Sequence, residues 1–200
     1  MLKKQVLTLL LCFTVFTSIS NAQNFGGGII GGLSISQLSG DQLAGYDKGG
    51  ILFGFFTNRT IGKKLLGKME LIYIQKGSKN PEKDERHEYL LNYIEIPILL
   101  QYNIQQDLRI EGGVQLAILI KEKEQDTFGI EQILRESFNK NDISISVGLE
   151  YKLTENIWLN SRLSNTLFFA PIRKHSSNAT NWYNQGQYNN VVSFSFNYYI

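Results

Sequence analysis

Hydrophobic and polar residues alternate with a period of two along much of this chain, most clearly from Leu108 to Ile120. In this segment, LRIEGGVQLAILI, every second residue is apolar or Gly, while Arg109, Glu111 and Gln115 lie at positions between them. A strict period of two predicts a β-strand with one apolar and one polar face. These thirteen residues are enough for a tilted strand to cross a bilayer, which needs about 9 to 11 residues.

The same alternation recurs along the chain, so we predict an all-β fold of eight antiparallel strands. The predicted strands are 26–36, 48–58, 64–77, 89–104, 108–120, 142–153, 156–168 and 190–200. Short turns are expected at 59–63, 105–107 and 154–155, and long polar loops at 37–47, 78–88, 121–141 and 169–189. This alternation of turn and loop lengths is typical of up-and-down transmembrane β-barrels of the outer membrane, whose short turns and termini are periplasmic.

Three local patterns add detail to this prediction. Pro97 interrupts the fourth segment and lacks a ladder donor, so we expect a bulge or an unpaired acceptor there. In the third long loop, Asp126 and Thr127 precede an apolar periodicity that predicts a short amphipathic helix. The glycines of GGGIIGG, at 26–32, formally match a dinucleotide-binding fingerprint, but no strand precedes them, so a tightly curved wall is the better interpretation.

Alternation alone leaves open whether the apolar face meets lipid or fills the interior of a soluble, lipocalin-like barrel. Three observations favour lipid. The polar positions are rich in small residues, and the apolar positions of the fifth, sixth and eighth predicted strands contain no charge. Tyr102, Tyr151 and Tyr198 lie on the apolar face near the periplasmic strand ends, as expected of an interfacial girdle. A soluble periplasmic binding barrel remains the alternative.

The first 22 residues have the three parts of a secretory signal peptide. Lys3 and Lys4 precede an apolar run that ends in small and polar residues, so we expect cleavage after Ala22 and a barrel domain over 23–200, with no cell-wall-binding domain after it. Cys12 lies in the removed segment, which excludes disulfides and cysteine metal sites from the mature chain. The 20 basic residues exceed the 18 acidic ones only through the two leader lysines, so nothing indicates nucleic acid.

Several stretches resemble the PorT-like family of small Gram-negative outer-membrane β-barrels. They are LSISQLSGD, ELIYIQKGSK, NYIEIPILLQY, GGVQLAIL, GLEYKL and the aromatic final strand. The segment around Pro97 is the most distinctive of them. The resemblance implies the barrel fold, an outer-membrane location and, in some members, a link to secretion or surface assembly. The last residue, Ile200, departs from the Phe that commonly ends outer-membrane proteins and serves the barrel assembly machinery.

Seven charged residues fall on the predicted lumenal face and form the main candidate site. They are Glu70, Glu95, Arg109, Glu111, Glu150, Lys152 and Arg162. They could form a proton or ion relay or a binding site. The interpretation that we favour is a structural plug of ion pairs, because an eight-stranded barrel is only wide enough for side chains and buried charges must be paired.

The long loops carry the remaining candidates. Trp182, Tyr183 and Tyr188 lie among Asn, Gln and Ser, a composition typical of adaptable recognition surfaces, although interfacial aromatics of a loop would look the same. His87 and His175 are the only histidines, and an enzyme acting on lipid or peptide would need one of them beside a nucleophile and an acid. We expect no catalytic site, no cofactor and no metal, and partners limited to outer-membrane lipid and an unknown surface or secretion component.

Overall fold

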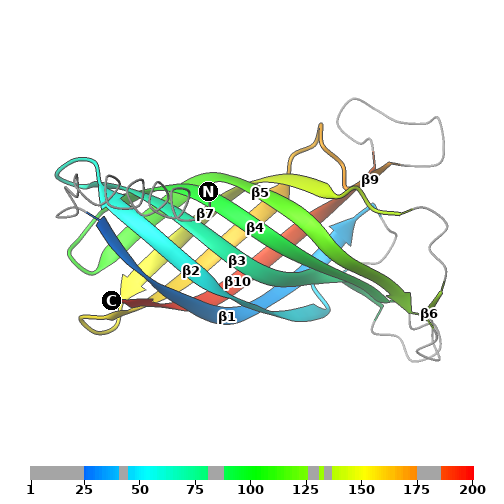
Figure 1. The fold of residues 1–200 in the computed structure, drawn as a ribbon, viewed down its shortest axis with the longest axis horizontal. Helices are drawn as coiled ribbons and strands as arrows, with labels where there is room; N and C mark the ends of the chain where they lie inside the picture. Colours follow the sequence, from blue (N-terminus) through cyan, green and yellow to red (C-terminus); the bar gives the residue numbers. More distant parts are fainter. Residues whose placement is uncertain (1–24, 41–44, 81–87, 126–130, 133–136, 175–185) are drawn as a thin grey trace, which may run out of the picture.

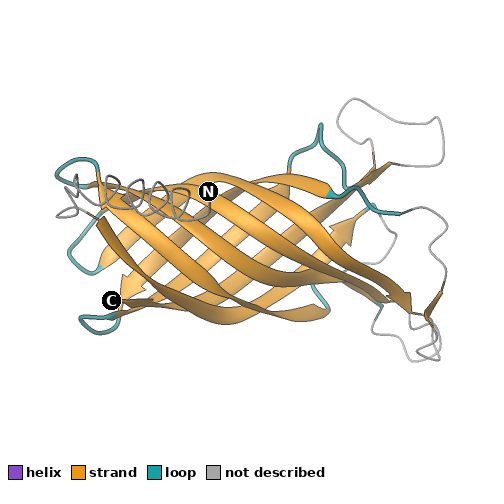
Figure 2. Ribbon diagram, in the orientation of Figure 1, coloured by secondary structure: helices purple, strands orange, loops and turns teal. Residues whose placement is uncertain are grey.

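A computed structural model of the protein describes residues 25–40, 45–80, 88–125, 131–132, 137–174 and 186–200. Strands and loops make up this part of the chain (Figure 2). The long strands are β1 (Phe25–Ser39), β2 (Lys48–Thr60), β3 (Leu65–Lys79), β4 (Glu88–Asn103), β5 (Leu108–Gln125), β7 (Asn141–Lys152), β8 (Ile157–Thr166) and β10 (Gly186–Tyr199). The short strands β6 (Glu131–Gln132) and β9 (Arg173–Lys174) pair with β5 and β10.

The eight long strands close into an antiparallel barrel (Figure 1). Each strand pairs with its neighbour along the chain, and β1 pairs with β10 through a register that places Leu33 opposite Phe194. Closure gives each of the eight long strands a hydrogen-bonded neighbour on both sides, as a sheet that spans hydrocarbon requires. The predicted all-β up-and-down barrel is therefore confirmed, with short turns at one end and long connections at the other.

The two faces of the wall are sorted as the alternation predicts. Ile110 and Ile145 are 42% and 51% exposed, whereas Ser144 and Ser146 beside Ile145 are buried. The exposed apolar side chains lie outside and the buried polar ones inside, which is the reverse of a soluble barrel with an apolar interior. Tyr102, Tyr151 and Tyr198 are also exposed on the outer face, at the short-turn ends of β4, β7 and β10.

The glycines of β1 allow the strands to approach closely. A Cβ atom on Gly32 would lie 2.1 Å from the carbonyl oxygen of Phe194, and one on Gly28 would lie 1.9 Å from that of Tyr198. Gly31, on the outer face, has open space around it. The inward glycines are thus needed for wall packing, in agreement with the interpretation of GGGIIGG as wall rather than nucleotide loop.

Pro97 interrupts the ladder without producing the bulge. The β3–β4 pairing runs through Met69–Ile98 and Ile72–Glu95, and the two pairs between them are missing. Those pairs would use the N–H that Pro97 lacks, so the carbonyl group of Glu70 is the unpaired ladder acceptor. The register shift of β4 and β5 lies instead between Asn92 and Tyr93, where β5 carries one extra residue, Ile120.

At the long-loop end, β3 is hydrogen-bonded to side chains of β1 instead of to the backbone of β2. The backbone ladder between them begins at Leu52–Ile74, so β3 beyond Ile74 has no β2 partner. Serine side chains of β1 replace it: the Ser34 hydroxyl donates to the carbonyl oxygen of Gln75 at 2.8 Å, and Ser36 bonds both backbone groups of Gly77. A side chain on the intervening Gly50 would collide with Gln75, so its glycine is required.

The helix expected in the third long loop is not found in the described residues. Glu131 and Gln132 form β6 and pair with Gln125 and Glu124 of β5, so this part of the loop extends a strand instead. Residues 126–130 and 133–136 lie outside the described residues. Among the residues that the structure describes, no helix is long and apolar enough to cross a membrane.

An apolar core lies inside the barrel and continues into the connections at its long-loop end. Ile72, Ile74 and their neighbours fill the middle of the lumen, although they share the polar parity of β3. Further along the axis, Leu91, Phe138 and Ile172 are buried and join β4 to the β5–β7 and β8–β10 connections. The long-loop end is therefore packed in its own right.

Candidate functional site: the closed lumen

Six charged side chains from four strands form a buried lower charge cluster near the short-turn end. Its members are Lys68, Glu70, Arg109, Glu111, Glu150 and Arg162. Arg162, on β8, makes hydrogen bonds to two carboxylates of this cluster. Its Nη1 and Nη2 donate to the two carboxylate oxygens of Glu70 at 2.7 and 2.8 Å, and its Nε donates to Glu111 at 2.8 Å. This fork geometry is the strong bidentate form of an arginine–carboxylate pair.

Glu150 of β7, in the same lower charge cluster, accepts hydrogen bonds from all around the barrel. Lys68 Nζ and Arg109 Nη1 lie 3.1 and 3.2 Å from its carboxylate. Asn197 Nδ2 donates at 2.6 Å and the Tyr199 hydroxyl at 3.2 Å, both from β10. With three acids and three bases the cluster is formally neutral, which is what burial of charge away from water requires.

A smaller upper charge cluster, Lys76, Glu95 and Asp142, lies toward the long-loop end. Lys76 Nζ forms an ion pair with Glu95 and lies 3.5 Å from Asp142 Oδ2. Asp142 also accepts hydrogen bonds from Thr166 at 2.9 Å and from Asn189 at 2.9 Å. The upper charge cluster therefore ties β3, β4, β7, β8 and β10 together across the lumen.

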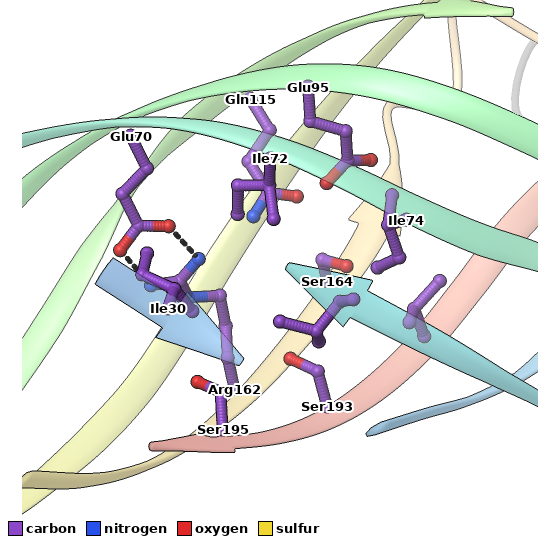
Figure 3. A pocket seen from close by; sticks show the side chains of 12 residues that line it. Ile30, Glu70, Ile72, Ile74, Glu95, Gln115, Arg162, Ser164, Ser193 and Ser195 are labelled. Atoms are coloured by element: carbon purple, nitrogen blue, oxygen red, sulfur yellow. Dashed lines mark hydrogen bonds and ion pairs between the residues drawn. The ribbon is translucent and has the colours of Figure 1, made fainter. Parts of the chain in front are cut away.

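The space between the two clusters is nearly filled. A cavity of about 10 Å³ lies there, and its lining includes the apolar side chains of Ile30, Ile72 and Ile74 as well as Arg162, Gln115 and three serines. Figure 3 shows Glu70 and Arg162 joined at its edge and the isoleucines reaching toward its centre. A cavity of this size has room for about one water molecule. This section of the lumen is consequently closed to a hydrated solute.

Six of the seven charges predicted for the lumen lie there, and one does not. Glu70, Arg109, Glu111, Glu150 and Arg162 belong to the lower charge cluster, and Glu95 to the upper one. Lys152 has the lumenal parity but lies at the short-turn rim, where its Nζ pairs with Glu155 at 2.8 Å. Lys152 is the last residue of β7, so its side chain lies at the end of the barrel rather than among the buried charges.

Three members of the clusters were not among the predicted residues. Lys68 and Lys76 lie on the same parity of β3 as Glu70, and Asp142 lies on the parity of the buried serines of β7. The alternation of faces along each strand was the signal that could have identified these residues. In β3 this signal was obscured because the inward-facing positions carry both charged residues and the apolar Ile72 and Ile74.

Of the three aromatic residues predicted for loop recognition, the structure describes one, Tyr188. Tyr188 is not in a loop: it belongs to β10, is 8% exposed, and donates its hydroxyl to the carbonyl oxygen of Phe168 at 2.8 Å. It is therefore a structural residue of the packed end. Trp182 and Tyr183, like His87 and His175, lie outside the described residues.

The ion pairs limit the chemical roles that the lumenal carboxylates can have. Each carboxylate of the two clusters lies against a lysine or an arginine, and the described residues contain no group of three or more His, Cys, Asp or Glu suited to a metal ion. The ion pairs of the two clusters join side chains of β3, β4, β5, β7 and β8 across the lumen.

Comparison with known proteins agrees with this architecture. The family model described as outer membrane protein beta-barrel domain matches residues 21–168. The crystal structure of Ail, the attachment invasion locus protein of Yersinia pestis, has a TM-score of 0.54 at 12% identity, covering 88% of this chain and 99% of Ail. Ail in complex with the heparin analogue sucrose octasulfate gives 0.52 at 10% identity, with the same coverage. At these identities the likeness shows the fold alone.

Other comparisons add little to the assignment. Neisserial surface protein A is 15% identical over 87% of this chain and 96% of its own, with a TM-score of 0.49. No functionally curated protein matches the chain. The family match spans most of the sequence and agrees with the closed barrel, its apolar outer face and its charged interior. This chain belongs to the outer membrane protein β-barrel domain family.

Proposed function

We propose that this protein is a non-conducting, non-enzymatic outer-membrane barrel that acts through its outer surface, as a binding component or as an accessory of secretion or surface assembly. The closed lumen is the observation that carries the proposal. Two ion-pair clusters with an apolar layer between them fill the interior, and the space left between the clusters measures only about 10 Å³. A barrel whose lumen offers no path for solutes can still bind partners through its surface.

The long-loop end is the part of that surface best suited to binding. In outer-membrane barrels the long connections face the cell exterior. The described parts of two of these connections are packed against each other: the Asn139 N–H donates to the carbonyl oxygen of Ile172 at 2.6 Å, and its side-chain amide donates to that of Pro171 at 2.7 Å. The guanidinium group of Arg173 lies 4.3 Å from the ring centre of Phe138. Segments that are ordered before binding lose less entropy on binding.

Two resemblances support the proposal. Ail, which has the same fold, forms a complex with the heparin analogue sucrose octasulfate. Stretches such as NYIEIPILLQY around Pro97 resemble the PorT-like family, some members of which are linked to secretion or surface assembly.

A planar-bilayer recording tests the closed lumen. The purified barrel is expected to insert without producing a stable ion current. A porin of about 16 to 18 strands, whose lumen is an aqueous channel, recorded in the same bilayer serves as the conducting control. Stable large conductance by the unaltered protein would contradict the proposal.

Site-specific photo-crosslinking in intact cells tests the surface role. A crosslinking amino acid replaces exposed Tyr46 or Lys174 at the long-loop end, or exposed Lys63 or Asn156 in the short turns as matched controls. We expect a discrete adduct from the first pair only. Adducts confined to the short turns would place the working surface in the periplasm and refute the proposal.

A further inference from the structure

The extra residue in β5 changes which charges face the membrane. Along the regular part of β5 the even-numbered residues point outward, as exposed Leu116 and Ile118 show. Tyr93 pairs with Leu119 but Asn92 pairs with Lys121, so Ile120 is bulged out of the ladder. A shift of one residue exchanges the faces of every residue beyond it. From Lys121 onward, therefore, the odd-numbered residues face outward.

The charges beyond the bulge are sorted by this exchange. Glu122 is on the inner side, where its carboxylate accepts the N–H of buried Phe138 at 3.0 Å. Glu124 pairs in register with Tyr89, which is also buried. Lys121 and Lys123 lie between them on the opposite face, and Lys121 is exposed. Without the bulge, the two glutamates would face outward in place of the two lysines.

Lys121 and Lys123 pair in register with Asn92 and Leu90, on the outer side of β4. We call these two lysines, Lys121 and Lys123, the lysine patch. Directly below it the outer wall is apolar and exposed: Leu116, Ile118 and Ile120 of β5 and Ile143 of β7. The lysine patch thus lies at the upper border of the lipid-facing belt.

The position of the lysine patch selects its partner. Side chains at the border of the apolar belt on the long-loop side lie at the headgroup level of the outer leaflet. Lysine is a compact cation that binds phosphate as a point charge. We propose that the lysine patch binds the phosphorylated headgroup of an outer-leaflet lipid, whose acyl chains then lie against the apolar wall of β5 and β7, and that the Ile120 bulge is the device that turns the lysines toward it.

Lipid retention by the purified full-length barrel tests this proposal. The barrel is exchanged into mild detergent containing either lipid A, as the phosphorylated probe, or its dephosphorylated form, and bound lipid is counted by native mass spectrometry. We expect retention of the phosphorylated probe alone. Each lysine near an anionic lipid surface contributes about a factor of five, so K121Q/K123Q is expected to bind the phosphorylated probe roughly twenty-five-fold more weakly.

The chain offers a matched control. Lys63 and Lys64 are adjacent exposed lysines in the short turn at the opposite rim, so K63Q/K64Q removes the same charge and should leave retention unchanged. Heat-dependent migration on gels verifies that both variants are folded. Equal retention of the two lipid forms, equal binding by K121Q/K123Q, or displacement of the lipid by millimolar inorganic phosphate would each overturn the proposal.

Deletion of Ile120 tests the role of the bulge separately. Removing the extra residue restores regular alternation and turns Glu122 outward, so phosphorylated lipid should be lost as in K121Q/K123Q. If the folded deletion variant retains the lipid as the unaltered barrel does, the bulge does not control the orientation of the lysines and this part of the proposal fails.

Discussion

Replacing Arg162 by Met removes three charged hydrogen bonds from the lower charge cluster while keeping a side chain of similar length. Arg162 gives two of these bonds to Glu70 and one to Glu111, at 2.7 to 2.8 Å. Glu70 retains Lys68 at 3.0 Å, but Glu111 retains only the side-chain amides of Gln101 and Asn160. The variant therefore holds three buried carboxylates against two bases.

The magnitude follows from the burial of this site. Both Glu70 and Glu111 have side chains with at most 1% exposure, so water cannot replace the lost guanidinium group. Removing one partner of a buried ion pair costs about 3 to 5 kcal/mol, because the remaining charge is left uncompensated. Against a total free energy of unfolding of about 5 to 15 kcal/mol, this is a large fraction. We expect R162M to fold with a strongly reduced urea midpoint.

Urea unfolding from phospholipid vesicles measures this change. Trp158, which is buried in the lumen and stacks on Arg109 at 3.7 Å, provides a fluorescence signal. The control is K152M, which removes the rim pair of Lys152 with Glu155; the glutamate side chain is 88% exposed, so the expected cost is below about 1 kcal/mol.

A double variant separates charge balance from packing. E70Q/R162M leaves two acids and two bases in the lower charge cluster, so it should be more stable than R162M alone. The reasoning would be refuted if R162M cost no more than K152M, or if the double variant were destabilised by the sum of the two single changes or more.

Two further predictions concern the wall. Gly32→Ala places a Cβ atom 2.1 Å from the Phe194 carbonyl oxygen and should sharply lower the yield of folded barrel in vesicles. Gly31→Ala is the control, because Gly31 has open space around it and the variant should fold normally. Equal yields of the two variants would contradict the close approach of the strands. Pro97→Ala supplies a ladder N–H to the unpaired carbonyl group of Glu70, so its new amide should be protected in hydrogen exchange, and fast exchange there would contradict the assigned register.

Much of the fold was predictable because side-chain alternation in a strand is a local property. The period of two along Leu108–Ile120 and its counterparts gave eight strands, their direction and the face that each residue occupies, and closure followed from the need to pair every edge in hydrocarbon. Where the alternation is regular, as at Ile110 and Ile145, exposure agrees with it. For the same reason Glu70, Glu111 and Arg162 could be placed in the lumen before any contact was known.

Alternation could not supply the contacts between strands, because they depend on register and closure. The sequence alone determined an outer-membrane type of barrel with charges inside. Only the tertiary structure decided that Arg162 joins Glu70 and Glu111, that Tyr188 is a buried strand residue and that Ile120 exchanges the faces of the charges beyond it. The physical reason is that a side chain's face is set by its own strand, whereas its partner is set by how distant strands are aligned around the barrel.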